Sequence, residues 1–199
     1  MLKNSQLHID GKLALYKTFF VSLQKCNTMK KCIKITIIGI LSIILVGFLI
    51  PQNLKMPVEG ADSNDYNHET FWSEGWGTSI VHKGVDVFAK KGTRINSATW
   101  GIVLMTAERG KGGKFVVTLG PKWRLHYYAH LDEIKTKPFA FVTQDTEIGT
   151  VGNTGNAITT PAHLHYGIGT LIPYLWRIDN APLGWQKMFY LNPIDYLDK

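Results

Sequence analysis

The longest apolar run in the chain covers residues 35–50, ITIIGILSIILVGFLI, and its sixteen residues include no charged side chain. As an α-helix this run would be about 24 Å long, at about 1.5 Å per residue. It is longer than the roughly 7–15 apolar residues of a signal peptide and shorter than the roughly 20 of a full membrane crossing. The run has no polar face, which disfavours a helix in a soluble core. No small-x-small cleavage site follows closely, so we expect a transmembrane anchor or uncleaved signal, with a cleaved signal peptide as the alternative.

Beyond residue 75 the apolar positions fall into short runs separated by glycine-rich turns. Residues 92–106 predict a strand, a turn and a second strand. Residues 113–131 predict a hairpin that turns at Gly120-Pro121. Residues 147–155 hold three glycines, as tight turns require.

The same pattern predicts how the chain is divided. No stretch of a dozen residues after residue 75 has a helical period with caps. We therefore predict an all-β domain over residues 76–199, with at most a short helix or turn near 183–190. Residues 51–75 are polar and contain prolines, asparagines and aspartates, which predicts a linker.

The formal charge of +7 lies mostly before the apolar run. Residues 1–34 carry seven lysines and one acid, Asp10, whereas residues 35–199 carry 15 basic and 14 acidic groups. Because lysine-rich flanks stay in the cytoplasm, residues 1–34 are expected to form a basic cytoplasmic leader. The body then faces the periplasm or cell exterior, as a single-pass protein of the cytoplasmic (inner) membrane. The segment Met29-Lys30-Lys31-Cys32 is typical of the start of an anchor sequence, so we expect residues 1–28 to be an extension ahead of a start at Met29.

Charge and cysteine content exclude several classes of protein. The nearly neutral body and its outward location argue against a nucleic-acid partner, although the sequence pI near 9.3 suggests one. Residues 71–137 hold 11 basic and five acidic groups, which predicts a solvated surface or attraction to an anionic cell wall. The two cysteines, Cys26 and Cys32, exclude a disulfide scaffold or a cysteine-rich zinc module.

Five of the seven histidines fall between residues 82 and 165. The first of them, His82, stands four residues before Asp86. Gly84 and the β-branched Val85 between them disfavour a helix, but a turn that leads into a strand would bring both side chains to one point. Imidazole and carboxylate are both good zinc ligands. Taken alone, this pair is more typical of a surface ion pair.

Two further histidine pairs lie in predicted strands. Residues two apart on a strand point to the same face, so His163 and His165 would lie side by side with Leu164 turned to the core. A solvated polar face is the alternative. In a regular strand His126 and His130 would also share a face, and we expect an exposed or half-buried position for His126. Two histidines with one carboxylate would leave the fourth zinc position to water, as in catalytic zinc sites.

Four ordered motifs resemble those of the lysostaphin-like (LytM-type) zinc metallopeptidases, which cut peptide bonds in bacterial peptidoglycan. They are H-x-G-x-D at residues 82–86, Y-x-H-L at 128–131, G-x-x-G-x-T-G at 149–155 and H-L-H-Y at 163–166. The resemblance covers about residues 78–170, just under half of the chain. It implies an antiparallel β-sheet domain with the site in a groove on the sheet.

The resemblance also implies roles for individual residues. His82, Asp86 and His165 would bind Zn²⁺, while His130 and His163 would be the catalytic pair. Water activated by zinc would attack the peptide carbonyl, and the two catalytic histidines would share proton transfer and stabilisation of the oxyanion. The alternative is a non-catalytic LytM-type regulator that activates other cell-wall hydrolases. The bond cut, a glycine–glycine bridge or a D-alanine-containing cross-link, stays open, as does the oligomeric state.

Three segments depart from the pattern of that family. Residues 71–77 lack the usual phenylalanine-glycine-arginine lead-in, and residues 156–162 replace a serine-threonine-glycine run. Both segments are expected in loops of the groove wall, where they would change substrate preference. The tail over residues 171–191 is long and aromatic. We expect it to cover an edge of the core, with a substrate-facing or partner-binding role as the alternative.

Overall fold

The chain forms two compact units, residues 1–46 and residues 47–199. The computed structural model describes residues 28–76 and 79–197 of the chain. Most of the leader predicted over residues 1–34, including the extension over 1–28 apart from Thr28, lies outside the described residues.

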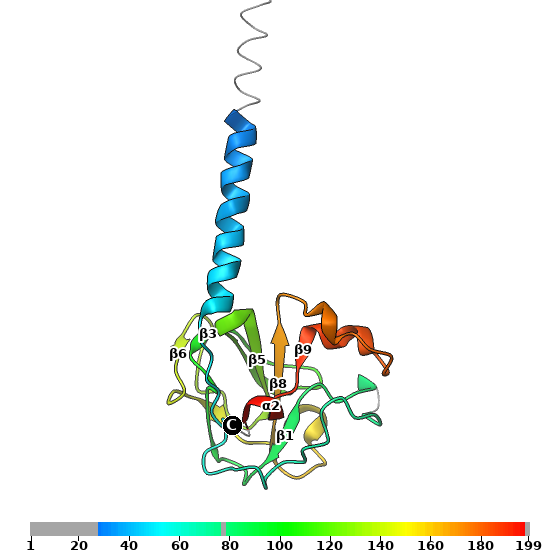
Figure 1. Ribbon diagram of the computed structural model, residues 1–199. Helices are drawn as coiled ribbons and strands as arrows, with labels where there is room; N and C mark the ends of the chain where they lie inside the picture. Colours follow the sequence, from blue (N-terminus) through cyan, green and yellow to red (C-terminus); the bar gives the residue numbers. More distant parts are fainter. Residues whose placement is uncertain (1–27, 77–78, 198–199) are drawn as a thin grey trace, which may run out of the picture. The chain divides into compact units, whose positions relative to one another are not determined.

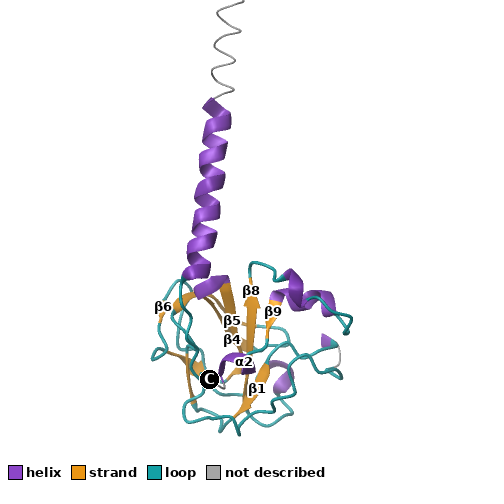
Figure 2. Cartoon of the chain, viewed as in Figure 1, coloured by secondary structure: helices purple, strands orange, loops and turns teal. Residues whose placement is uncertain are grey.

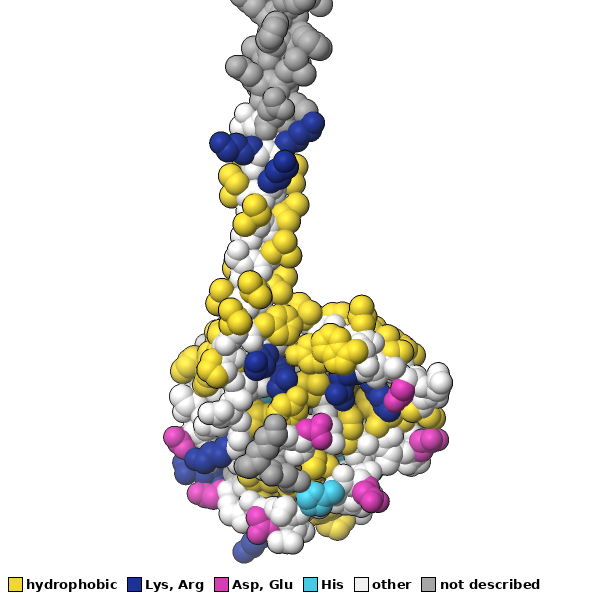
Figure 3. All heavy atoms as spheres, viewed as in Figure 1, with side chains coloured by type: hydrophobic (Ala, Val, Ile, Leu, Met, Phe, Trp, Pro, Cys, Tyr) yellow, Lys and Arg dark blue, Asp and Glu magenta, His cyan; other side chains and the backbone are white. Residues whose placement is uncertain are grey.

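The described part of the first unit is an apolar helix. Among the described residues, one helix, Thr28–Leu49, is long and apolar enough to cross a membrane. Its 22 residues correspond to about 33 Å. It begins seven residues before the predicted run of 35–50, because lysine has a good helix propensity and Lys30, Lys31 and Lys34 extend the helix. Figure 3 shows basic side chains gathered at its N-terminal end and apolar side chains along its length.

The second unit is built on a seven-stranded sheet in which neighbouring strands pair antiparallel (Figure 1). Its strands are β1 (Val85–Phe88), β3 (Gly101–Glu108), β4 (Lys114–Gly120), β5 (Arg124–Leu131), β6 (Phe141–Val142), β8 (His163–Thr170) and β9 (Tyr190–Leu191). The strand order is β1–β8–β5–β4–β3–β6, and β9 also pairs with β8. The predicted all-β, antiparallel architecture is therefore confirmed.

Strand alternation gives the sheet one core face and one open face. In β8 the side chains of Leu164 and Tyr166 are fully buried in the core, whereas His163 and His165 lie on the opposite face. In β5 Tyr128 points to the core and Tyr127 to the open face. The period of two along each strand thus separates the residues that stabilise the fold from those that line the groove.

Turns and several short helices connect the strands (Figure 2), whereas the sequence predicts turns and at most one short helix, near 183–190. The hairpin of β4 and β5 turns through a 3-10 helix, η2 (Pro121–Trp123). Another, η5 (Gly184–Phe189), occupies the region near 183–190 where a short helix is predicted. The remaining short helices are η3 (Gly155–Ala157), η4 (Leu175–Arg177) and the C-terminal α2 (Ile194–Leu197).

Residues 51–75 pack on the domain, which differs from the linker predicted from their composition. Val58 is 1% exposed and forms a bridge with Ile95 of β2 (Arg94–Asn96), which pairs with β7 (Glu147–Thr150). The side chain of Gln52 accepts a hydrogen bond from Arg124. These contacts join residues far apart in sequence, so the segment has no local periodicity that would reveal them.

His126 is fully buried, so the prediction of an exposed or half-buried position is wrong. Its Nδ1 lies 2.7 Å from the hydroxyl of Tyr166, and its Nε2 accepts a hydrogen bond from the Gln52 amide at 3.1 Å. Burial, and then the positive charge of Arg124, lower the pKa of His126 to about 3. The imidazole is therefore held neutral inside the domain, because both of its nitrogens already have partners.

This burial predicts an acid-sensitive fold. Between pH 6.5 and about 3 the unfolded chain binds a proton at His126 that the folded chain excludes, so the free energy of unfolding falls as the pH falls. For His126 alone the expected loss between pH 8 and pH 5 is about 2 kcal/mol. Denaturant unfolding of the full chain in detergent micelles should show a weaker pH dependence for His126→Gln by about this amount. If the free energy of unfolding changed equally with pH in the wild type and in His126→Gln, the assignment of this pH dependence to His126 would be wrong.

Candidate metal centre

The pairing of β1 with β8 brings together ligands that are far apart in the sequence. Asp86 of β1 is directly opposite His165 of β8 in the register. His82 lies in the turn that precedes β1, where the chain enters the strand from the open face. The predicted turn-into-strand arrangement of His82 and Asp86 is what the structure shows.

Three ligand atoms converge at this point. The Nε2 atom of His82 lies 3.1 Å from Oδ1 of Asp86 and 3.0 Å from Nδ1 of His165. The same Nδ1 atom lies 2.8 Å from Oδ1 of Asp86. Facing lone pairs repel unless a proton or cation lies between them, so this arrangement fits a bound cation.

The donor set fits zinc in particular. Bonds of about 2.0–2.2 Å from zinc to nitrogen or oxygen would separate the corners of a tetrahedral site by about 3.3–3.6 Å. The observed separations of 2.8–3.1 Å are within a few tenths of an ångström of that range. His82 and Asp86 are buried and His165 is partly buried. With three protein ligands, a fourth position stays available to water or substrate.

The surroundings of Asp86 and His165 favour the protonation states in which these side chains bind metal. Burial by itself raises the pKa of Asp86, but hydrogen bonds from His165 and His82 outweigh it and hold the pKa far below its usual range. Burial lowers the pKa of His165, against the opposite effect of Asp86. At neutral pH the centre therefore offers an ionised carboxylate and a neutral imidazole, which are the forms that bind metal.

Gly84 makes the close approach of these side chains possible. A Cβ atom at this position would lie 2.5 Å from the carbonyl oxygen of Tyr166 and 2.9 Å from the imidazole ring of His165. Both distances are shorter than side chains tolerate, and one of the two obstacles is backbone. The glycine of the H-x-G-x-D motif therefore has a steric role between the two ligands His82 and Asp86.

His130 and His163 lie beside the three ligands. Their rings are 5.0 Å apart between centroids, and His130 is 5.9 Å from the ring of His165. Nδ1 of His130 lies 2.9 Å from the carbonyl oxygen of Thr154, and Nδ1 of His163 lies 2.8 Å from that of Pro161. A carbonyl oxygen only accepts, so both Nδ1 atoms carry the proton and both Nε2 atoms keep a lone pair.

His130 reaches the site through an irregular backbone. In a regular strand it would share the core face with His126. Its φ of 64° is in the left-handed region, which is uncommon for a residue other than glycine. This local break in β5 turns the side chain to the groove. Burial, followed by the nearby His165 and His163, lowers the pKa of His130 to about 4, so its imidazole is neutral at pH 7.

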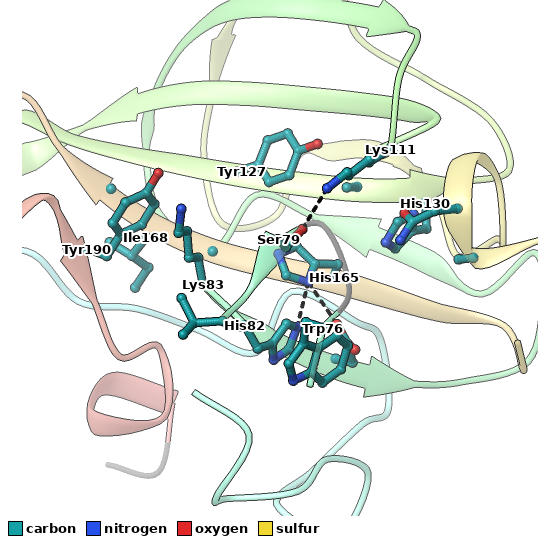
Figure 4. A pocket seen from close by; sticks show the side chains of 18 of the residues that line it. Trp76, Ser79, His82, Lys83, Lys111, Tyr127, His130, His165, Ile168 and Tyr190 are labelled. Atoms are coloured by element: carbon teal, nitrogen blue, oxygen red, sulfur yellow. Dashed lines mark hydrogen bonds and ion pairs between the residues drawn. The ribbon is translucent and has the colours of Figure 1, made fainter. Parts of the chain in front are cut away.

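The five predicted site residues all line a single cavity of about 1120 Å³ on the open face of the sheet. Figure 4 shows the histidines with Trp76, Lys83, Lys111 and Tyr190 around them. Trp76 stacks on His82 with ring centroids 3.9 Å apart. The sequence analysis placed the 71–77 and 156–162 segments in groove walls, and Trp76 and Asn156 do line the cavity.

The sequence analysis missed other residues that line the cavity. Lys83 and Lys111 belong to the basic stretch over 71–137, for which the sequence predicts a solvated surface or attraction to an anionic cell wall, and no prediction is made for Tyr127 or Tyr190. The position of Lys83 directly after His82 was the available signal for one of them. Gln186 and Tyr190 line the cavity, so the tail over 171–191 also forms a wall of the groove, as in the alternative to an edge cover.

The residues around the site are similar to a known protein family. Residues 80–173 match Peptidase family M23. A stretch of 113 residues is 32% identical to a Bacillus subtilis protein named L-Ala--D-Glu endopeptidase, over 52% of this chain and 35% of that protein. Another of 85 residues is 35% identical to the Vibrio cholerae protein named Peptidoglycan DD-endopeptidase ShyA, over 43% of this chain and 19% of that protein.

A solved structure shares the fold. The catalytic domain of lysostaphin from Staphylococcus simulans superposes with a TM-score of 0.54 at 21% identity, over 68% of this chain and 95% of that domain. The matched stretches span only about a third and about a fifth of the two relatives' lengths. The chain is therefore similar to only part of each of these relatives.

The convergence of ligands predicts how metal content responds to substitution. The purified full chain should hold about one zinc ion, and His82→Ala should hold less than about a tenth of that, because two ligands bind zinc poorly. His130→Ala should keep its zinc, since the structure does not place this ring among the converging atoms. Elemental analysis by mass spectrometry measures both. Full zinc content in His82→Ala would exclude the proposed ligand set.

Proposed function

Because residues 80–173 form a peptidase family M23 domain, we propose that this protein is a membrane-anchored zinc endopeptidase that hydrolyses peptide bonds of bacterial peptidoglycan. The observation that carries the proposal is the convergence of His82, Asp86 and His165 beside two further histidines in one groove. The names of the two relatives support the substrate, since one is called a peptidoglycan endopeptidase and the other an endopeptidase acting between L-Ala and D-Glu.

His82, Asp86 and His165 would hold the metal through Nε2, Oδ1 and Nδ1. A zinc ion held there would supply Lewis acidity and would activate a water molecule for attack. The rest of the chemistry belongs to side chains of the groove. His82, Asp86 and His163 are buried, and electrostatic interactions between buried groups are stronger than in water.

His130 and His163 would move protons. Each donates its Nδ1 proton to a backbone carbonyl, which fixes the ring and leaves the Nε2 lone pair for the reaction. A neutral imidazole accepts a proton from the attacking water and returns it to the leaving amine. In its protonated form it donates a hydrogen bond to the developing oxyanion. Both rings are oriented in this way, so we propose that His130 and His163 together transfer protons and stabilise the oxyanion, and we do not assign one of these roles to each ring.

The complete set of ligands and proton carriers favours hydrolysis over a purely regulatory role. A regulator that only contacts other hydrolases has no need for a buried carboxylate with a depressed pKa or for two oriented imidazoles. The helix Thr28–Leu49, with lysines at its N-terminal end, supports a single-pass location with the catalytic domain outside the cytoplasmic membrane.

The proposal predicts a separation between activity and metal content. His163→Ala should lower the rate of hydrolysis by about 10²–10⁴-fold while its zinc content stays near that of the wild type. The release of peptide fragments from purified peptidoglycan, followed by mass spectrometry, measures the rate. His68→Ala is the matched histidine control, because His68 lies outside the cavity, and it should retain wild-type activity.

Two outcomes would count against the proposal. Wild-type hydrolysis by His163→Ala would remove this residue from the catalytic pair. A zinc-loaded wild-type chain that releases no fragments, yet stimulates a second cell-wall hydrolase, would contradict catalysis and establish the regulatory alternative.

The anchor is tested at the middle of the helix. Arginine at the centre of a membrane helix costs about 2.5–3.5 kcal/mol per residue. The double variant Ile40→Arg and Ile43→Arg should therefore leave the membrane fraction on an alkaline wash, whereas the full wild-type chain stays there. The double variant with valine at both positions is the apolar control. Retention of the arginine variant in washed membranes would rule out this helix as the anchor.

A further inference from the structure

The groove is electropositive even before a metal is considered. Its described lining includes two lysines, Lys83 and Lys111, and one acidic residue, Asp86. Asp86 is already engaged by the two histidines that converge on it. The groove therefore presents two ammonium groups and no free carboxylate to a substrate.

Lys83 is held against one wall by neutral partners. Its Nζ atom donates to the side-chain oxygen of Gln186 at 2.6 Å and lies 5.3 Å from the centre of the Tyr190 ring. An ammonium group has three donors, and the contact with Gln186 uses one. The side chain is partly buried, so its charge acts in a region of reduced screening.

Lys111 extends from the turn between β3 and β4 toward the same cavity. Its Nζ atom donates to the hydroxyl of Ser79 at 3.0 Å, which is again a neutral partner. Among the described residues, neither lysine has a carboxylate within ion-pair distance. Other lysines of the domain do have one: Lys91 pairs with Asp132, and Lys135 pairs with Glu147.

The two positive charges affect each other. Both ammonium groups line one cavity, and each contacts a neutral side chain there. Repulsion between these two ammonium groups in a partly buried groove destabilises the protein when no substrate is bound. An anion bound between the two walls would relieve that repulsion and would gain charge-assisted hydrogen bonds.

We infer that the groove selects peptides that carry a free carboxylate close to the scissile bond, with Lys83 and Lys111 as the groups that bind it. This inference rests on the proposed peptidase function and names its substrate class. It also distinguishes between the two bonds that the sequence leaves open, a glycine–glycine bridge and a D-alanine-containing cross-link. A glycine bridge has no side-chain charge, whereas a cross-linked peptide that contains an acidic residue has the anion that these lysines can bind.

The experiment compares two synthetic cross-linked peptides. They are identical except that the acidic residue beside the scissile bond carries a free carboxylate in one and a carboxamide in the other. Binding to the full-length His163→Ala protein, in which hydrolysis is suppressed, is measured by calorimetry in detergent micelles. A charge-assisted hydrogen bond contributes about 1.5–3 kcal/mol, so the carboxylate peptide should bind about tenfold more tightly or better.

The lysine variants test the assignment of residues. The double variant of Lys83→Gln and Lys111→Gln should reduce the preference to less than about twofold, since it removes both positive charges and keeps polar side chains. The matched control is Lys137→Gln, because Lys137 is exposed and lies outside the cavity. It should keep the full preference. Unchanged zinc content and unfolding midpoints show that the variants are folded.

Two results would overturn the inference: equal affinity for the two peptides in the His163→Ala protein, or an undiminished preference in the double lysine variant. Hydrolysis of both peptides by the wild type is measured in parallel. If the wild type cleaves neither peptide but binds the carboxylate peptide selectively, the proposed catalytic function fails and the binding site stands. If it cleaves both at equal kcat/KM and binds them equally, the function stands and the carboxylate site fails.

Discussion

The antiparallel pairing of β1 with β8 is the constraint on which the site depends. It places Asp86 opposite His165 although 79 positions separate them in sequence. The same pairing holds Leu164 in the core, so a register slip of one residue would bury the histidines and expose the core side chains. The strand pairing that stabilises the sheet thus also positions the candidate metal ligands. It holds the ligand atoms of His82, Asp86 and His165 at 2.8–3.1 Å from one another at a partly buried site.

Backbone carbonyls have a comparable role for the proposed catalytic pair. The carbonyl oxygens of Thr154 and Pro161 accept the Nδ1 protons of His130 and His163. This direction leaves the Nε2 lone pairs for the reaction without using any further charged residue. The electrostatic character of the groove then comes from the metal ligands and from Lys83 and Lys111. One face of the sheet therefore combines two oriented imidazoles with the positively charged side chains of Lys83 and Lys111.

The walls of the groove come from segments with little regular structure. Residues 71–76, the turn around Lys111 and the tail that ends at β9 each contribute side chains to the cavity. Loops of this kind vary more readily than the strands beneath them. The arrangement keeps the candidate metal ligands on the sheet and forms the walls from loops, which is consistent with a fold shared with the lysostaphin catalytic domain at 21% identity.

Much of this protein could be predicted from the sequence, because strand alternation and local motifs are short-range properties. The apolar helix, the antiparallel all-β domain and the β4–β5 hairpin follow from spacing within a few positions, and the resemblance of four short motifs indicates the five site residues. Tertiary structure alone decided the rest. His126 is buried because Gln52 and Tyr166 meet it from distant parts of the chain. His130 turns to the groove through a φ of 64°, and Lys83 and Lys111 share a cavity through contacts that no local pattern records.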